Sequence, residues 1–208
     1  MEDTDMEDNS FARKFSRDKR CYIGLDVGTQ STKGVLVHCG TREILGRSSL
    51  AYGLEPTGGV PGRAEQNPQV WVDAVAHVLG ELGIVLKASD HILGGVGVSG
   101  QQHGMVALSA DFTPLRHAKL WCDVEASSEA TEISEQATTL LETSISIPPG
   151  FTIPKVLWMK RNEPDLFSKL RWCILPHDYI NLLLCHGPNP DSSGSIVPTT
   201  DAGDASGT

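Results

Sequence analysis

Three segments rich in apolar and β-branched residues follow one another near the N-terminal end of the sequence, and their spacing limits the fold more than any other feature. They cover residues 22–26, 33–39 and 44–52, with short gaps between them. Gaps of this length suit hairpin turns. We therefore expect the fold to begin with an antiparallel meander.

A long helix is expected after these strands. A loop rich in glycine and proline leads to Asn67 and Pro68, the residue types preferred at a helix N-cap and at the first helical position. Apolar side chains then recur at helical spacing, at Trp71, Ala74, Val75, Val78, Leu79 and Leu82. This pattern predicts an amphipathic helix with one face against a core.

Strands and helices alternate along the rest of the sequence. The apolar, glycine-rich segment 92–99 is predicted to be a buried strand. Further strands are expected at residues 105–108, 118–121 and 172–175, and helices at 125–142, at 154–160 and from about residue 178. From Gly187 onward the composition is that of a loop, with no closing element. A hairpin run followed by this alternation predicts an α/β fold with a mixed sheet.

Composition and charge argue against several classes of function. The net charge is −9, and no basic face offers the attraction that nucleic-acid binding needs. No apolar run approaches the roughly 18 residues of a membrane span, so neither nucleic acid nor a membrane is an expected partner. The five cysteines are widely spaced without a CxxC pair, which indicates reduced thiols in a cytoplasmic protein. Residues 1–20 lack the apolar core of a signal peptide and are predicted to be a disordered tail before one domain at 21–208.

The first predicted turn gathers residue types that hold phosphate. Asp26 ends the first strand, and Thr29, Gln30 and Ser31 add polar side chains to a glycine-containing turn. Converging turn amides suit phosphate oxygens, Asp26 could bind Mg²⁺ directly or through water, and Lys33 offers a positive charge. An ordinary hairpin, with Asp26 capping the turn and Lys33 solvated, would explain the same residues. The Walker A pattern of P-loop enzymes is absent.

A second glycine-rich stretch, GGVGVSGQQHG at residues 94–104, allows two interpretations. Gly95, Gly97 and Gly100 fit the GxGxxG spacing of nicotinamide-dependent enzymes. That fingerprint needs a helix directly after the strand, however, and here another strand is expected. Glycines within a strand more simply permit the close approach of a neighbouring backbone or a ligand.

Polar side chains gather at the end of that strand, at Ser99, Gln101, Gln102 and His103. Their donors and acceptors form the kind of cluster that binds the hydroxyl groups of a sugar. A histidine whose hydrogen bonds are satisfied within its own loop is the alternative.

Two further motifs have a structural and a functional interpretation. Trp121 lies close to Asp123 after a predicted strand, so the pair could stack on a sugar and accept a hydroxyl, or Trp121 could pack in the core. His177 and Asp178 lie at a predicted helix start, where we expect Asp178 to cap the helix rather than to form a catalytic dyad. The histidines show no metal-binding spacing, and the GxSxG nucleophile motif is absent.

Six segments taken together resemble the FGGY family of carbohydrate kinases, and within it the xylulokinases. They occur in order between about Tyr22 and Thr208, as YIGLDVGTQSTKG, VGVSGQQHG, LWCDVEASSEA, PPGFTIPKVLWMKRNEPDLF, LPHDYINLLL and DAGDASGT. The ordered set of six segments is far more specific than YIGLDVGTQSTKG alone, because actin, hexokinases and heat-shock chaperones share that first segment more loosely. The resemblance implies a ribonuclease-H-like, actin-like ATPase domain that forms the N-terminal half of a two-domain sugar kinase.

The resemblance also implies roles for individual residues. Asp26 would be the acid linked to Mg²⁺ and to activity, and Gln102, His103 and Asp123 would contact a ketose. The phosphate loop would comprise Gly28, Thr29, Gln30, Ser31 and Lys33. Bacterial relatives often have methionine in place of Gln102 and an Asn-Asp-Gly-Arg run in place of residues 122–125, so this sequence departs from the family pattern in the segments expected to contact the sugar.

The family's catalytic base is an aspartate in a glycine-rich segment beyond DASGT, so the resemblance places the base and the second domain outside these 208 residues. We expect the N-terminal part of a kinase that uses ATP and Mg²⁺ to convert a ketopentose, D-xylulose above all, to its 5-phosphate. The 208 residues alone are expected to be inactive. A non-catalytic short form that binds a sugar or a partner is the alternative, and a dehydrogenase is a more distant one.

Overall fold

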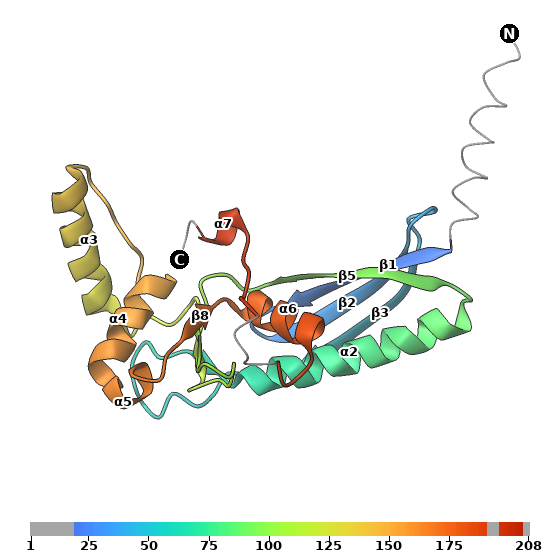
Figure 1. The fold of residues 1–208 in the computed structure, drawn as a ribbon, viewed down its shortest axis with the longest axis horizontal. Helices are drawn as coiled ribbons and strands as arrows, with labels where there is room; N and C mark the ends of the chain where they lie inside the picture. Colours follow the sequence, from blue (N-terminus) through green and yellow to red (C-terminus); the bar gives the residue numbers. More distant parts are fainter. Residues whose placement is uncertain (1–18, 191–195, 206–208) are drawn as a thin grey trace, which may run out of the picture. The chain divides into compact units, whose positions relative to one another are not determined.

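A computed structural model describes residues 19–190 and 196–205 (Figure 1). The chain divides into two compact units, one formed by residues up to Ala51 together with Asp73–Ser99, the other by Tyr52–Val72 and Gly100–Thr208. The tail predicted at residues 1–20 lies outside the described residues except for its last two, and Arg20 already belongs to the first strand. The assignment of residues 21–208 to one domain stays a prediction.

The first unit is built on a four-stranded sheet in the order β3-β2-β1-β5. Its strands are β1 (Arg20–Val27), β2 (Ser31–His38), β3 (Ile44–Ala51) and β5 (Ile92–Gly100). β1 pairs antiparallel with β2, and β2 pairs antiparallel with β3. The predicted meander is therefore confirmed, and it forms part of a mixed sheet in an α/β fold.

Helix α2 (Pro68–Ala88) lies along this sheet (Figure 1). It begins at the predicted residue, where the Asn67 side chain accepts a hydrogen bond from the backbone N–H of Gln69 at 3.0 Å. Gly34 of β2 allows close packing, because a Cβ at this position would lie 3.0 Å from Leu82 of α2 and would overlap Val78. The apolar face of α2 is thus buried on the sheet, as its periodicity predicts.

Among the described helices, α2 alone is long and apolar enough to cross a membrane, judged by length and composition only. The sequence analysis did not expect such a segment because Asp73 and Glu81 interrupt the apolar run. A core helix meets the same criteria, and α2 buries Val78 and Leu82 against the sheet of its own unit.

The prediction of a buried strand at residues 92–99 is wrong in its burial, although the strand itself is present. β5 lies at the edge of the sheet beside β1, and in the described structure Ile92, Leu93 and Val96 are 59%, 46% and 38% exposed. An apolar, glycine-rich composition can identify a strand, but it does not show whether another element covers that strand.

The second unit combines two small antiparallel pairs with helices. β4 (Glu65–Gln66) pairs with β7 (Ala118–Lys119), and β6 (Val106–Leu108) pairs with β8 (Trp172–Ile174). The helices are α3 (Ser127–Leu141), α4 (Thr152–Asn162), α5 (Pro164–Phe167), α6 (Pro176–His186) and α7 (Ala202–Ala205). A core cluster joins β6 to α4 and consists of Met105, Ala107, Ala126, Trp158 and Met159.

The structure corrects three details of the second unit. α6 begins at Pro176 with Leu175 as its N-cap, so Asp178 lies inside the first turn rather than at the cap. The sequence analysis missed α5, and it also missed α7, which lies in a stretch with the composition of a loop. A helix of one turn has too few residues to show a periodic apolar pattern.

Candidate functional site

The hairpin of β1 and β2 presents Asp26 and Lys33 directly opposite each other. The two residues are paired in the antiparallel register, and both are exposed. Their neighbours Leu25 and Val27 are buried, as the alternation of a strand requires. The backbone N–H of Gly28 donates to the carbonyl of Ser31 at 3.0 Å and closes the turn.

This turn offers a donor set that suits a hydrated magnesium ion beside phosphate. Mg²⁺ in phosphate-transfer sites keeps several waters and needs only one or two carboxylates, and Asp26 supplies one exposed carboxylate. Thr29, Gln30 and Ser31 lie between the two charged residues in sequence and are also solvent-accessible. The phosphate and metal roles of these residues stay predictions.

His103, in the second unit, has a constrained backbone and a stacked side chain. Its φ angle is +55°, in the left-handed region that few residues other than glycine adopt. Its imidazole stacks on the ring of Phe151 with centroids 4.3 Å apart and planes 15° apart. Gln102 is exposed and His103 is half-buried, so both side chains reach the surface of this unit.

The other predicted members of this polar cluster lie elsewhere. Gln101 is buried, and its side-chain amide donates to Gln66 Oε1 at 3.3 Å. The same oxygen accepts a hydrogen bond from the indole of Trp71 at 2.9 Å. Ser99 belongs to the first unit. Gln101 therefore has a structural role in the second unit, while Gln102 and His103 are the cluster members of that unit that present polar groups to solvent.

A buried lysine of α4 holds the backbone of His103. The ammonium of Lys155 donates to the carbonyl of His103 at 2.6 Å and to the carbonyl of Gly150 at 2.5 Å. Lys155 is fully buried. Burial lowers the pKa of this lysine to about 8, against the opposing attraction of the nearby Asp123 carboxylate.

Asp123 is fully buried, and its carboxylate accepts several hydrogen bonds. One oxygen accepts from the backbone N–H of Ala64 at 2.9 Å, and the other from that of Glu125 at 3.2 Å. The ammonium of Lys119, also fully buried, lies 3.3 Å from the carboxylate. These contacts fix the position of Asp123 in the second unit, and its predicted contact with a sugar stays a prediction.

Lys119 is the centre of a larger buried ion network. Its ammonium lies 2.5 Å from Glu125 and 3.2 Å from Glu65, and 4.0 Å from the centre of the Trp158 ring. Glu65, Asp123 and Glu125 are close enough together to share a metal ion. The Lys119 ammonium already contacts all three carboxylates, so their charge has a partner within the chain.

Two arginines complete this network. Arg63 donates two hydrogen bonds to Glu125, at 3.1 and 2.8 Å, and Arg116 binds Glu65. Burial acts to raise the pKa of Glu125, but the hydrogen bonds from Arg63 and Lys119 outweigh it and hold the pKa below its ordinary value.

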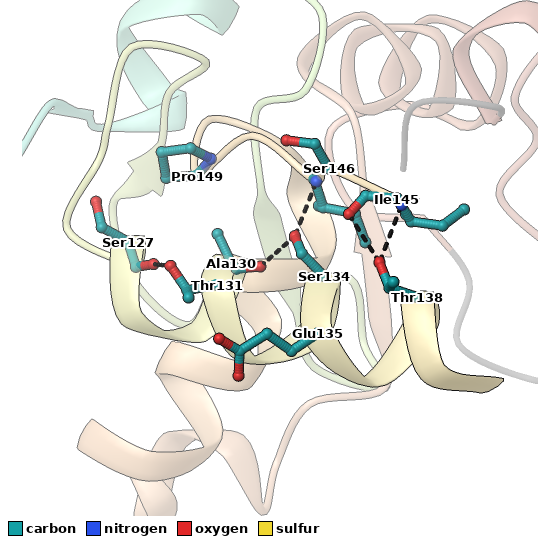
Figure 2. Close-up of a pocket in the computed structure, with 10 residues that line it drawn as sticks. Ser127, Ala130, Thr131, Ser134, Glu135, Thr138, Ile145, Ser146 and Pro149 are labelled. Atoms are coloured by element: carbon teal, nitrogen blue, oxygen red, sulfur yellow. Dashed lines mark hydrogen bonds between the residues drawn. The ribbon is translucent and has the colours of Figure 1, made fainter. Parts of the chain in front are cut away.

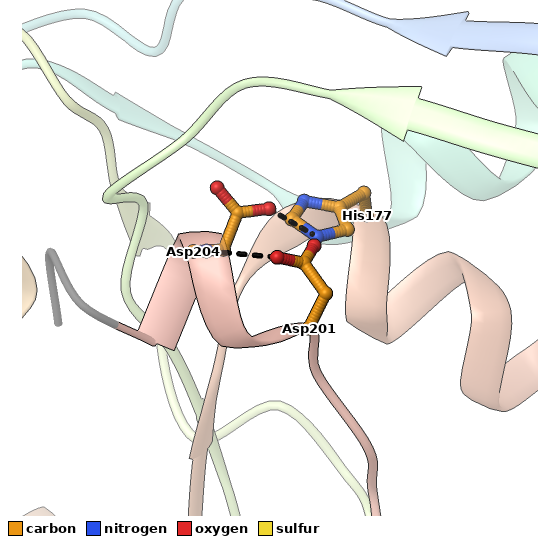
Figure 3. A group of neighbouring side chains, drawn as sticks. All are labelled: His177, Asp201 and Asp204. Carbon is orange, nitrogen blue, oxygen red and sulfur yellow. Dashed lines mark hydrogen bonds and ion pairs between the residues drawn. The ribbon is translucent and has the colours of Figure 1, made fainter.

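A third cluster surrounds the imidazole of His177 at the start of α6 (Figure 3). Its Nε2 atom lies 3.2 Å from Asp178 and 3.1 Å from Asp204. Asp201 accepts hydrogen bonds from the backbone N–H groups of Gly203 and Asp204, at 2.7 and 2.9 Å, and so caps α7. His177, Asp201 and Asp204 are close enough to bind a cation, and their contacts already connect α6 to α7.

A groove of about 440 Å³ runs along α3 (Figure 2). Its hydroxyl groups bind the backbone of the segment that follows the helix. Thr138 accepts from the backbone N–H of Ile145 at 2.9 Å, and Ser134 accepts from that of Ile147 at 2.9 Å. These contacts give Ser134 and Thr138 of α3 a structural role.

The predicted site residues therefore divide between the two units. Asp26 and Lys33 come together in the first, and His103 and Asp123 belong to the second. Sequence reasoning missed Lys155 and Lys119. Lys155 lies in the segment PPGFTIPKVLWMKRNEPDLF and Lys119 directly precedes LWCDVEASSEA, but no role was predicted for either residue. Lysine is among the residue types least expected at a fully buried position.

Comparisons with known proteins identify the family. Residues 21–208 match the model of the "FGGY family of carbohydrate kinases, N-terminal domain". The chain is 35% identical over 194 residues to the xylulose kinase of Haemophilus influenzae, covering 89% of this chain and 37% of that protein. It is 34% identical over 188 residues to the xylulose kinase of Lactococcus lactis, covering 89% and 35%. The chain thus spans a little over a third of the length of these relatives.

Solved structures agree with this assignment. The xylulose kinase of Rhodospirillum rubrum shares 30% identity and a TM-score of 0.69, covering 79% of this chain and 34% of that one. A ligand-bound xylulose kinase from Lactobacillus acidophilus shares 27% identity and a TM-score of 0.73, covering 91% and 36%. These proteins have the actin-like fold that the sequence resemblance implies. The chain belongs to the FGGY family of carbohydrate kinases and corresponds to its N-terminal domain.

Proposed function

We propose that this chain is the N-terminal part of an ATP-dependent kinase that phosphorylates D-xylulose to D-xylulose 5-phosphate in the cytoplasm. The observation that carries the proposal is the similarity, at 31–35% identity, to xylulose kinases from several bacteria over most of the chain. The hairpin with Asp26 opposite Lys33 supports it, because phosphoryl transfer depends on positioning and charge stabilisation.

The two units would supply different parts of the reaction. The hairpin turn would bind the phosphates of ATP, with Lys33 facing their negative charge and Asp26 holding Mg²⁺ through water. The bound ion would neutralise charge that develops during transfer. Gln102 and His103 would hydrogen-bond the hydroxyl groups of the ketose and orient it.

A non-catalytic form that binds a sugar or a partner protein is the second candidate. The exposed Gln102 and the half-buried His103 are compatible with it, because both side chains reach the surface of the second unit. The first candidate predicts turnover and the second does not, whereas both allow the chain to bind a sugar.

An ADP-release assay with D-xylulose tests the proposal, using the 208-residue chain both alone and joined to an FGGY C-terminal kinase domain. We expect ketose-dependent turnover only in the joined form, since base catalysis alone typically contributes a factor of about 10² to 10⁴. Calorimetry on the chain alone measures sugar binding independently. A chain that binds neither D-xylulose nor ATP, and a joined form without turnover, would show that the proposed function is wrong.

A further inference from the structure

The geometry points to Lys155 as a positioning residue that sets the orientation of the His103 imidazole for recognition of the ketose. This inference rests on the proposed function, because it gives Lys155 a role in sugar binding through His103. Lys155 lies on α4, 52 residues after His103 in sequence. It lies in the segment PPGFTIPKVLWMKRNEPDLF, to which the family resemblance assigned no sugar or phosphate contact.

The first argument is the path of the hydrogen bonds. Two donors of one ammonium bind the carbonyls of His103 and Gly150, at 2.6 and 2.5 Å. Gly150 directly precedes Phe151, whose ring stacks on the imidazole at 4.3 Å. The ammonium therefore ties together the backbones of the two residues whose rings are in contact.

The second argument is the backbone of His103. A φ angle of +55° is unfavourable for a side chain with a Cβ, and such angles persist where surrounding contacts enforce them. The hydrogen bond from Lys155 to the His103 carbonyl is a contact of this kind. Without it, we expect His103 to return to an ordinary φ angle, which would turn its imidazole away from Phe151.

The third argument is the position of the ammonium in the unit. Lys155 is fully buried, and a buried charge is retained only where its hydrogen bonds are satisfied. A lysine that only filled space in α4 could be replaced by an apolar residue. The charges and thiols that act on the ammonium are Asp123, Cys122 and Cys173, which favour its protonated form, and Lys119, which opposes it.

Nuclear magnetic resonance on the 208-residue chain tests the inference. In the wild-type chain we expect the ring signals of His103, assigned by comparison with His103→Ala, to show the ring-current shift of an imidazole stacked on a phenylalanine. In Lys155→Met this shift should be lost, and the affinity for D-xylulose should fall at least about tenfold. Lys160→Met, which removes an exposed lysine from the last turn of the same helix, should change neither quantity.

The outcomes separate this inference from the proposed function. A wild-type chain that fails to bind D-xylulose counts against the proposed function, and the ring signals of His103 then decide the role of Lys155 alone. Unchanged ring signals and unchanged affinity in a folded Lys155→Met chain would overturn the inference.

A second measurement applies if Lys155→Met does not fold. Between about pH 7.5 and pH 10 the ring signals of wild-type His103 should move with a midpoint near 8, the pKa of Lys155, because the neutral amine binds carbonyls more weakly than the ammonium. Ring signals that stay constant over this range would refute the link between the two residues.

Discussion

The substitution Lys119→Met would show how strongly the buried ion network holds the second unit together. The Lys119 ammonium lies 2.5 Å from Glu125, 3.2 Å from Glu65 and 3.3 Å from Asp123. Glu125 keeps Arg63 in the variant, and Glu65 keeps Arg116. The main loss is therefore the charged partner of Asp123.

The loss in the free energy of unfolding can be estimated from these contacts. Removal of one partner from a buried ion pair typically costs about 3–5 kcal/mol in the free energy of unfolding. Asp123 keeps its hydrogen bonds from the backbone N–H groups of Ala64 and Glu125, which places the expected loss nearer about 3 kcal/mol. Methionine has a similar volume, so a cavity adds little to this loss.

Urea denaturation of the variant, followed by circular dichroism, measures this loss. Lys160→Met serves as the matched control, because Lys160 is exposed and its replacement should change the free energy of unfolding little. A loss below about 1 kcal/mol in Lys119→Met would show that the network is solvated or that Asp123 gains another partner.

The pH dependence of stability supplies an independent check. The pKa of Glu125 in the folded chain lies below its ordinary value because Arg63 and Lys119 outweigh the effect of burial. Its contribution to stability is therefore present at neutral pH and is lost as the pH falls through the folded pKa. Lys119→Met removes one of these partners, so the fall in stability below about pH 5 should be smaller than in the wild-type chain.

Three further predictions concern packing, thiol chemistry and catalysis. Gly34→Ala should lower the free energy of unfolding by about 1–3 kcal/mol, because the added methyl overlaps Val78 of α2. Gly97→Ala should leave the free energy of unfolding unchanged, because no atom lies within 4 Å of the added methyl; urea titration of both variants measures the difference. Burial raises the pKa of Cys173 to about 12, so iodoacetamide near pH 8 should alkylate it far more slowly than the exposed Cys39, as measured by peptide mass spectrometry. Asp26→Asn, in a form that includes a C-terminal kinase domain, should lower kcat by at least about 100-fold with little change in ketose affinity; equal losses in both would place Asp26 at the sugar instead.

Local patterns predicted the elements of the first unit well. Hairpin spacing gave the meander, and the asparagine–proline pair gave the start of α2 at Pro68. Both signals depend on neighbouring residues in the sequence, which is why they could be recognised. The exposure of β5 could not be predicted from the sequence, because it depends on which element lies against the strand.

The candidate site was predicted less completely, for a related reason. Asp26 and Lys33 are seven residues apart and pair across one turn, so a sequence pattern contains both. Lys155 reaches His103 across 52 residues, and Arg63 reaches Glu125 across 62. No periodic pattern encodes contacts of that range, and the long side chains involved are ordinarily found on the surface.

The burial of Asp123 bears on the proposed recognition of a sugar by the second unit. Its oxygens accept from two backbone N–H groups and lie beside the Lys119 ammonium, so a sugar hydroxyl would have to compete with charged and backbone donors for the same acceptor. Gln102 is exposed and His103 half-buried, so both are more accessible to a ligand than the fully buried Asp123. If D-xylulose binds this unit, Gln102 and His103 are thus the better candidates for direct contact. Asp123 would then act at a distance, by fixing the backbone around Ala64 and Glu125 and by favouring the charged form of Lys155.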